Sequence, residues 1–71
     1  MVWDYSKLRG KIKEKYGTQE AFASAIGISA TSLSLKLNNE REFTQAEMNA
    51  SIEALELPHA EVRSLFFTQQ V

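Results

Sequence analysis

The stretch SATSLSL, residues 29–35, holds the side chains of this 71-residue chain that are best suited to contact a partner. Helical spacing places Leu33 and Leu37 on one face and leaves small side chains on the other. Serine and threonine hydroxyls donate and accept hydrogen bonds, and the methyl groups make apolar contacts. Such a face suits recognition better than burial. Its residues are Ser29, Ala30, Thr31, Ser32, Ser34 and Leu35.

Catalytic and metal chemistry are not indicated by the composition. The chain has one histidine, His59, and no cysteine. No serine has a histidine partner in the helical pattern, and there is no glycine-rich phosphate loop. We therefore expect no catalytic residue, no metal site and no cofactor, and we do not expect an enzyme.

Length and hydropathy predict a small soluble protein. A hydrophobic content of 44% is enough for a core, and 71 residues favour a single domain over residues 1–71. No apolar run approaches the roughly 20 residues that span a bilayer. The absence of cysteine fits a reducing compartment. We therefore expect a cytoplasmic protein that does not enter a membrane.

Charge is divided unevenly between the two halves of the sequence. Residues 1–41 hold seven Lys or Arg against four Asp or Glu, whereas residues 42–71 hold one against five. This asymmetry predicts a basic binding end and an acidic end turned away from it. Chance segregation on a solvated surface is the alternative, and the lysines of the first helix could likewise form only a solvated face.

Apolar spacing and capping residues predict five short helices and no strand. Asp4, Thr18 and Ser29 are natural N-caps for the first three helices. Thr44 and Glu47 have the spacing of a capping box, which starts the fourth. The fold class expected is therefore a compact all-α domain. The predicted helices cover about 4–16, 19–26, 30–37, 45–55 and 58–67.

The turn between the second and third helices is only three residues long. Gly27 opens it, and glycine adopts a left-handed backbone without penalty. Two helices joined by such a turn are typical of the DNA-binding helix-turn-helix, in which the second helix enters the major groove. Residues 30–37 are therefore the predicted recognition helix.

Residues 18–38 resemble the lambda-repressor-like (Cro-like) helix-turn-helix family. The five-helix layout is similar to that family across nearly the whole chain, and the segments KLNNEREFTQAEM and LELPHAEVRSLFF further resemble small phage-type repressors of Gram-positive hosts. Many members have an acidic residue and then Asn-Gly after the recognition helix, whereas Leu37, Asn38 and Asn39 stand here. The residues that carry the resemblance are Gln19, Ala23, Gly27, Ile28 and Leu33.

The helix-turn-helix geometry predicts double-stranded operator DNA as the partner. The six residues of the stretch 29–35 named above would contact base edges. No Arg, Asn or Gln on this helix offers a bidentate purine contact, so we expect a homodimer at least on DNA. The residues placed to hold phosphates are Thr18, Gln19, Lys36, Asn38, Asn39 and Arg41.

Several of these residues have structural alternatives. Thr18 and Ser29 are helix caps first, and Leu35 could instead pack against a neighbouring helix. Trp3 is expected in the core or as an anchor of the N-terminal segment. Phe66 and Phe67 are adjacent and cannot both enter one core, which makes one of them a candidate dimer contact.

Two functions from different classes follow. The first is a sequence-specific DNA-binding transcriptional repressor of the Cro type. The alternative is a protein-interaction modulator, an antirepressor that keeps the helix-turn-helix scaffold and binds a partner repressor, which the acidic second half and the weakly specifying Ser/Thr face favour. A DNA-binding antitoxin is a third interpretation, but only TQQV follows the fifth predicted helix, and such proteins usually carry a longer tail.

Overall fold

Capping residues and apolar spacing set the helices, which the computed structural model describes for residues 2–69. Within that range the elements are helical apart from an isolated bridge between Trp3 and Gln69, and the all-α prediction is confirmed. Of the segment 68–71, only residues 68 and 69 are described. The elements are α1 (Ser6–Tyr16), α2 (Gln19–Ile26), α3 (Ala30–Leu37), α4 (Gln45–Ala54), the 3₁₀ turn η1 (His59–Glu61) and α5 (Val62–Phe66).

The predicted N-caps of α2, α3 and α4 are confirmed. The Thr18 hydroxyl accepts the Ala21 N–H at 3.1 Å, and the Ser29 hydroxyl accepts the Ser32 N–H at 3.0 Å. Both bonds of the Thr44–Glu47 capping box are present. Each cap satisfies backbone groups that the first helical turn leaves free.

The first helix begins later than predicted, at Ser6 rather than after Asp4. The Asp4 carboxylate still accepts the Ser6 N–H at 2.8 Å. However, the Asp4 N–H is bonded to the Thr68 carbonyl at 2.7 Å, which holds this backbone beside the C-terminal segment. Tyr5, with φ −100° and ψ 19°, therefore takes the N-cap position in place of Asp4.

Three helices end on a residue with a left-handed backbone. In each, the N–H of the following residue donates to the carbonyl five positions earlier, at 2.8 to 3.1 Å, which is the Schellman arrangement. Sequence predicts this only for the glycine, because the other two residues pay a steric cost there. The three residues are Gly27 (φ 81°), Asn39 (φ 63°) and Glu56 (φ 55°).

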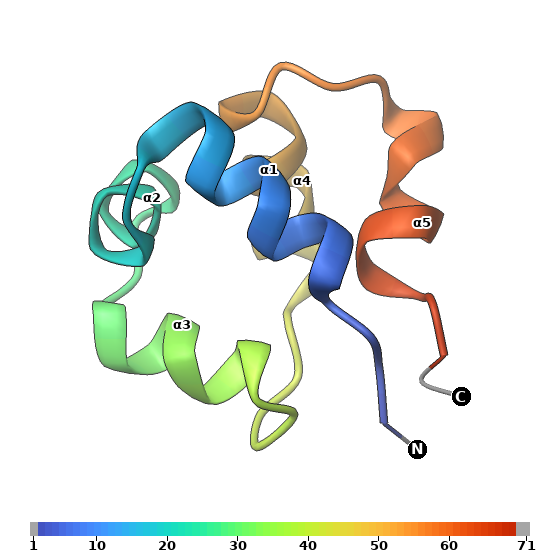
Figure 1. Cartoon of the computed structure of the whole chain (residues 1–71), viewed down its shortest axis with the longest axis horizontal. Helices are drawn as coiled ribbons and strands as arrows, with labels where there is room; N and C mark the ends of the chain where they lie inside the picture. Colours follow the sequence, from blue (N-terminus) through green and yellow to red (C-terminus); the bar gives the residue numbers. More distant parts are fainter. Residues whose placement is uncertain (1, 70–71) are drawn as a thin grey trace.

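The core lies around α1, which crosses the middle of the molecule between α2 and α5 (Figure 1). Phe66 is buried, whereas Phe67 is 43% exposed, as adjacent residues require. The Trp3 ring packs edge-to-face on Phe67 at 5.6 Å, so Trp3 anchors the N-terminal segment against the C-terminal one. The buried apolar residues are Tyr5, Leu8, Ile12, Phe22, Ala23, Leu33, Leu37, Phe43, Ile52, Leu55, Leu65 and Phe66.

A partly buried ion pair joins α3 to α4. The Lys36 ammonium lies 2.6 Å from a Glu47 carboxylate oxygen, and their side chains are 9% and 17% exposed. The same oxygen accepts the Thr44 N–H at 2.9 Å. Lys36 also donates to the Glu42 carbonyl at 3.3 Å and lies 6.0 Å from the centre of the Phe43 ring. The pair therefore fixes the loop between α3 and α4.

Within residues 2–69, no helix has the length and apolar character needed to cross a membrane.

Lys36→Met should destabilise the fold, because it leaves the Glu47 carboxylate without its cation in a site from which water is largely excluded. We expect the free energy of unfolding in urea to fall by about 3 kcal/mol. Lys15→Met is the control, since it removes an ion pair with the exposed side chain of Glu56 and should cost under about 1 kcal/mol. Equal small losses would show that Lys36 is not structural.

Acid should weaken the fold partly through Glu47. Burial alone raises the pKa of Glu47, but the hydrogen bonds from Lys36 and Thr44 and the Lys36 charge together lower it below its ordinary value of 4.5. A carboxyl with a lowered folded-state pKa stabilises the fold above about pH 4.5, and this contribution is lost as pH falls through the folded-state pKa. Urea unfolding between about pH 6 and about pH 3 should therefore show a shallower loss of stability in Glu47→Gln than in the wild type. Parallel losses would contradict this.

The two non-glycine helix ends should respond oppositely to glycine. Glu56→Gly removes the steric cost of a positive φ, and the only interaction lost is an exposed ion pair. The free energy of unfolding should therefore rise by about 0.5 to 1 kcal/mol. Asn39→Gly relieves the same cost but removes two hydrogen bonds between the Asn39 amide and the Trp3 backbone. Urea unfolding of this variant should show a loss of roughly 1 kcal/mol. A gain in both variants would mean that the Asn39 bonds contribute nothing.

Candidate interaction surface

The predicted helix-turn-helix geometry is formed by α2, the three-residue turn and α3. Gly27 adopts the left-handed conformation, and the Ile28 N–H closes the turn on the Ala23 carbonyl at 2.9 Å. Ala23 and Leu33 are buried between the helices. This places α3 along one edge of the molecule (Figure 1).

Fewer polar side chains of α3 are exposed and free to bind a partner than the sequence indicates. Ser29, Ala30 and Thr31 are exposed, whereas the other three predicted base-contact residues, Ser32, Ser34 and Leu35, are half-buried. The Ser29 hydroxyl caps the helix, and the Ser34 hydroxyl accepts from the Asn38 amide at 3.4 Å. Base contact by these six residues stays a prediction.

The structure removes Lys36 from the residues predicted to contact DNA phosphates. Its ammonium is enclosed beside Glu47 and cannot reach a phosphate on the surface. The physical reason is helical periodicity, because position 36 lies between Leu33 and Leu37 on the inward side of α3.

Two further members of that set are engaged within the chain. The Asn38 carbonyl oxygen accepts from Arg9 at 3.1 Å. The Asn39 amide bonds to both backbone groups of Trp3, at 2.8 and 2.9 Å. Phosphate contact would compete with these bonds. For the remaining three residues, Thr18, Gln19 and Arg41, it stays a prediction.

The prediction of a basic end turned away from an acidic end is wrong. Within residues 2–69, each of the three ion pairs joins the first half of the chain to the second. Lys7 pairs with Glu61 at 2.9 Å, and Lys15 pairs with Glu56. Packing of α1 beside α5 and the end of α4 brings these opposite charges together. Much of the basic excess of residues 1–41 is therefore neutralised.

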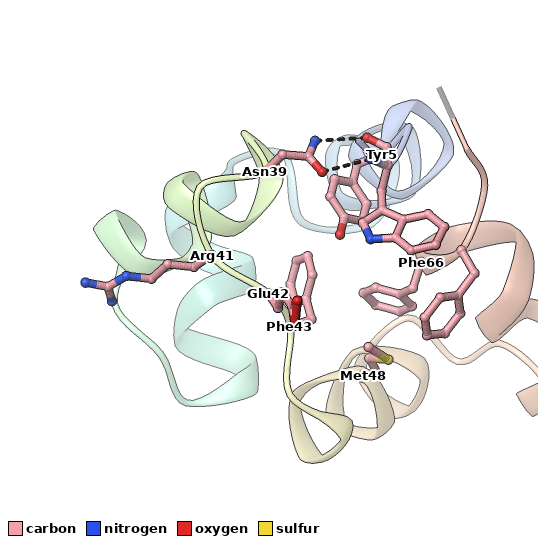
Figure 2. A pocket seen from close by; sticks show the side chains of 9 residues that line it. Tyr5, Asn39, Arg41, Glu42, Phe43, Met48 and Phe66 are labelled. Carbon is pink, nitrogen blue, oxygen red and sulfur yellow. Dashed lines mark hydrogen bonds between the residues drawn. The ribbon is translucent and has the colours of Figure 1, made fainter. Parts of the chain in front are cut away.

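A groove lined by aromatic rings lies between the two terminal segments and the loop that precedes α4. Its volume is about 260 Å³. Neighbouring rings pack edge-to-face, with Tyr5 at 5.4 Å and Phe66 at 5.0 Å from Phe43. Figure 2 shows Phe43, Met48 and Phe66 around the hollow. Its lining residues are Trp3, Tyr5, Asn39, Arg41, Glu42, Phe43, Met48, Phe66 and Phe67.

The groove also contains polar groups. The Tyr5 side chain is buried, yet its hydroxyl bonds to no group in residues 2–69. Burial and then the nearby Glu42 carboxylate raise the pKa of Tyr5 above its ordinary value of 10.0, so the hydroxyl stays protonated at neutral pH. In Figure 2, Glu42 lies beside Phe43, whereas Arg41 extends away from the hollow.

The groove is not predicted by the sequence. Trp3, Phe66 and Phe67 are predicted separately, as an anchor and a candidate dimer contact, and not as parts of one surface. The lining residues come from segments far apart in the sequence; Trp3 and Asn39, for example, are separated by 36 positions. No local pattern connects them. The one local signal was the run of aromatic residues near both ends of the chain.

Comparisons with known proteins show what the chain is similar to. Residues 1–69 match the family described as "Protein of unknown function (DUF739)". Among solved structures, the chain is similar to the modulator of repression (MOR) of the temperate bacteriophage TP901-1 from Lactococcus lactis, solved in solution, with 42% identity and a TM-score of 0.81. That match covers 100% of this chain and 96% of the other. Comparison with curated proteins finds no match. Because the family match spans residues 1–69, the chain belongs to the DUF739 family.

Proposed function

We propose that this chain modulates repression by binding a repressor protein through its aromatic groove. The observation that carries the proposal is the contrast between two surfaces of the described residues. The groove combines the half-buried Trp3 ring and the exposed Phe67 ring with a hydroxyl and a carboxylate that bond to no other side chain, whereas α3 offers no free cation. The 42% identity to a phage modulator of repression over the whole chain supports a repressor as the partner.

Electrostatics argues against DNA as the main partner. Affinity for DNA comes largely from Lys and Arg that neutralise phosphates. The one cationic residue of α3 is Lys36, and Glu47 already neutralises it. The whole chain has a formal net charge of −1. A polyanion would therefore meet few unpaired positive charges near the predicted recognition helix.

The exposed apolar surface argues for a protein partner. Among residues 2–69, the large hydrophobic side chains that are exposed are Val2 at 49% and Phe67 at 43%. Phe67 belongs to the groove, and Val2 is the neighbour of Trp3 in sequence. Aromatic residues in such positions commonly dominate the binding energy of protein interfaces. The groove is therefore the surface that a partner is expected to cover.

A DNA-binding repressor is the second candidate, because the observed geometry of α2, the turn and α3 favours it. In that case a homodimer would bind operator DNA, and Thr31 would lie against base edges. DNA selection with the wild type and with Thr31→Arg separates the two candidates. A changed base preference would support DNA binding, whereas absence of salt-sensitive binding by either protein would exclude it.

Phe67→Ala should weaken binding to the repressor encoded in the same genome by about 30-fold, because it removes an aromatic wall of the groove. Isothermal titration measures the affinity, and circular dichroism verifies that the variant folds. Phe67 is 43% exposed, so we expect only a small loss of stability.

Thr31→Arg is the control variant for the same titration, since Thr31 is exposed on α3 and does not line the groove. It should bind the repressor within about twofold of the wild type. If Thr31→Arg weakened binding and Phe67→Ala did not, the interface would lie on α3. If the wild type left the repressor unbound, the proposed function would be wrong.

A further inference from the structure

The lining of the groove includes two side chains that can accept hydrogen bonds. The Glu42 carboxylate is exposed there and forms no ion pair with any Lys or Arg in residues 2–69. The Tyr5 hydroxyl points toward the same hollow in Figure 2 and bonds to nothing within those residues. A carboxylate accepts hydrogen bonds, and a tyrosine oxygen can accept them as well. Two groups that can accept hydrogen bonds therefore belong to one lining, and neither accepts one from a side chain of residues 2–69.

Neither of the two cations near this space forms an ion pair with Glu42. Arg41 is the nearest cation in sequence, but its side chain extends away from the groove (Figure 2). Lys36 lies beside the Phe43 ring, and its charge is neutralised by Glu47. Glu42 is the one carboxylate among the lining residues, and within residues 2–69 it forms no ion pair.

We propose that the groove receives an arginine side chain of the partner repressor, with the guanidinium between Glu42 and the aromatic rings. This inference rests on the proposed function and specifies the chemistry of that partner. Charge complementarity carries it, because the site offers a carboxylate and a hydroxyl oxygen to a group that has five N–H donors. The half-buried Trp3 ring and the exposed Phe67 ring add cation–π attraction, which favours the planar guanidinium over an apolar side chain.

The dimensions of the groove agree with a single long side chain. A hollow of about 260 Å³ is too small for a helix but has room for one arginine with its three methylenes against the rings. Tyr5 packs on Phe43 at 5.4 Å, and Phe43 on Phe66 at 5.0 Å, so the Tyr5 hydroxyl is attached to a packed wall. A preformed wall lowers the cost of ordering on binding.

The test is isothermal titration of the whole chain with the repressor encoded in the same genome. Glu42→Gln should weaken binding by about tenfold and Glu42→Lys by at least about 100-fold, because the second change also repels the guanidinium. Glu40→Gln is the matched control, since Glu40 is an exposed acid of the same loop that does not line the groove, and it should stay within about twofold. The effect of Glu42→Gln should shrink at high salt.

Arg→Glu substitutions in the repressor identify the inserted residue. One of these repressor variants should bind the Glu42→Lys chain more tightly than it binds the wild-type chain. Such a reversal of preference is expected if the two residues form a direct ion pair. If Phe67→Ala weakened binding while Glu42→Lys did not, the groove would hold an apolar side chain; the arginine inference would fail and the proposed function would stand.

Sedimentation of the free chain tests the other occupant. Self-association that Phe67→Ala abolishes would mean that a second copy fills the groove, which would overturn the inference. If the wild type did not bind the repressor at all, both the inference and the proposed function would fail.

Discussion

The carboxylate of Glu47 is the group on which the arrangement of the second half of the fold depends. One of its oxygens accepts the Thr44 N–H, which starts α4, and also the Lys36 ammonium, which comes from α3. Removing such a pair from water is costly, and it persists only when both charges are satisfied. Lys36 further holds the Glu42 carbonyl. A single ion pair thus begins a helix, joins two helices and fixes the loop between them.

The parts of the fold that were predictable from sequence are those encoded within a few residues. The caps at Thr18 and Ser29 and the Thr44–Glu47 box are bonds between positions three apart, so residue type and spacing reveal them. The Lys36–Glu47 pair spans 11 positions and the Trp3–Asn39 bonds span 36. Contacts of that separation depend on how helices pack. The groove, which is built from such contacts, could not be predicted for the same reason.

The predicted separation of a basic end from an acidic end is wrong for the same reason, because it depends on contacts between distant segments. Counting charges along the chain separates a basic half from an acidic one, but folding places α1 beside the C-terminal elements and pairs Lys7 with Glu61. Lys36 is a partial exception, because its helical position between Leu33 and Leu37 already indicates the inward side. Charge along a sequence therefore informs on surface potential only after the packing of the helices is known.

The helix-turn-helix scaffold and the groove are mechanically linked at the end of α3. Asn39 ends that helix with a left-handed backbone, and its amide holds Trp3, one wall of the groove. Lys36, one turn earlier in α3, donates a hydrogen bond to the carbonyl of Glu42, another residue of the groove lining. On the proposed function, α3 therefore acts through its C-terminal end, which positions the groove, and its Ser/Thr face is not required to read bases. A scaffold typical of DNA recognition can in this way support a protein-binding surface without losing its helix packing.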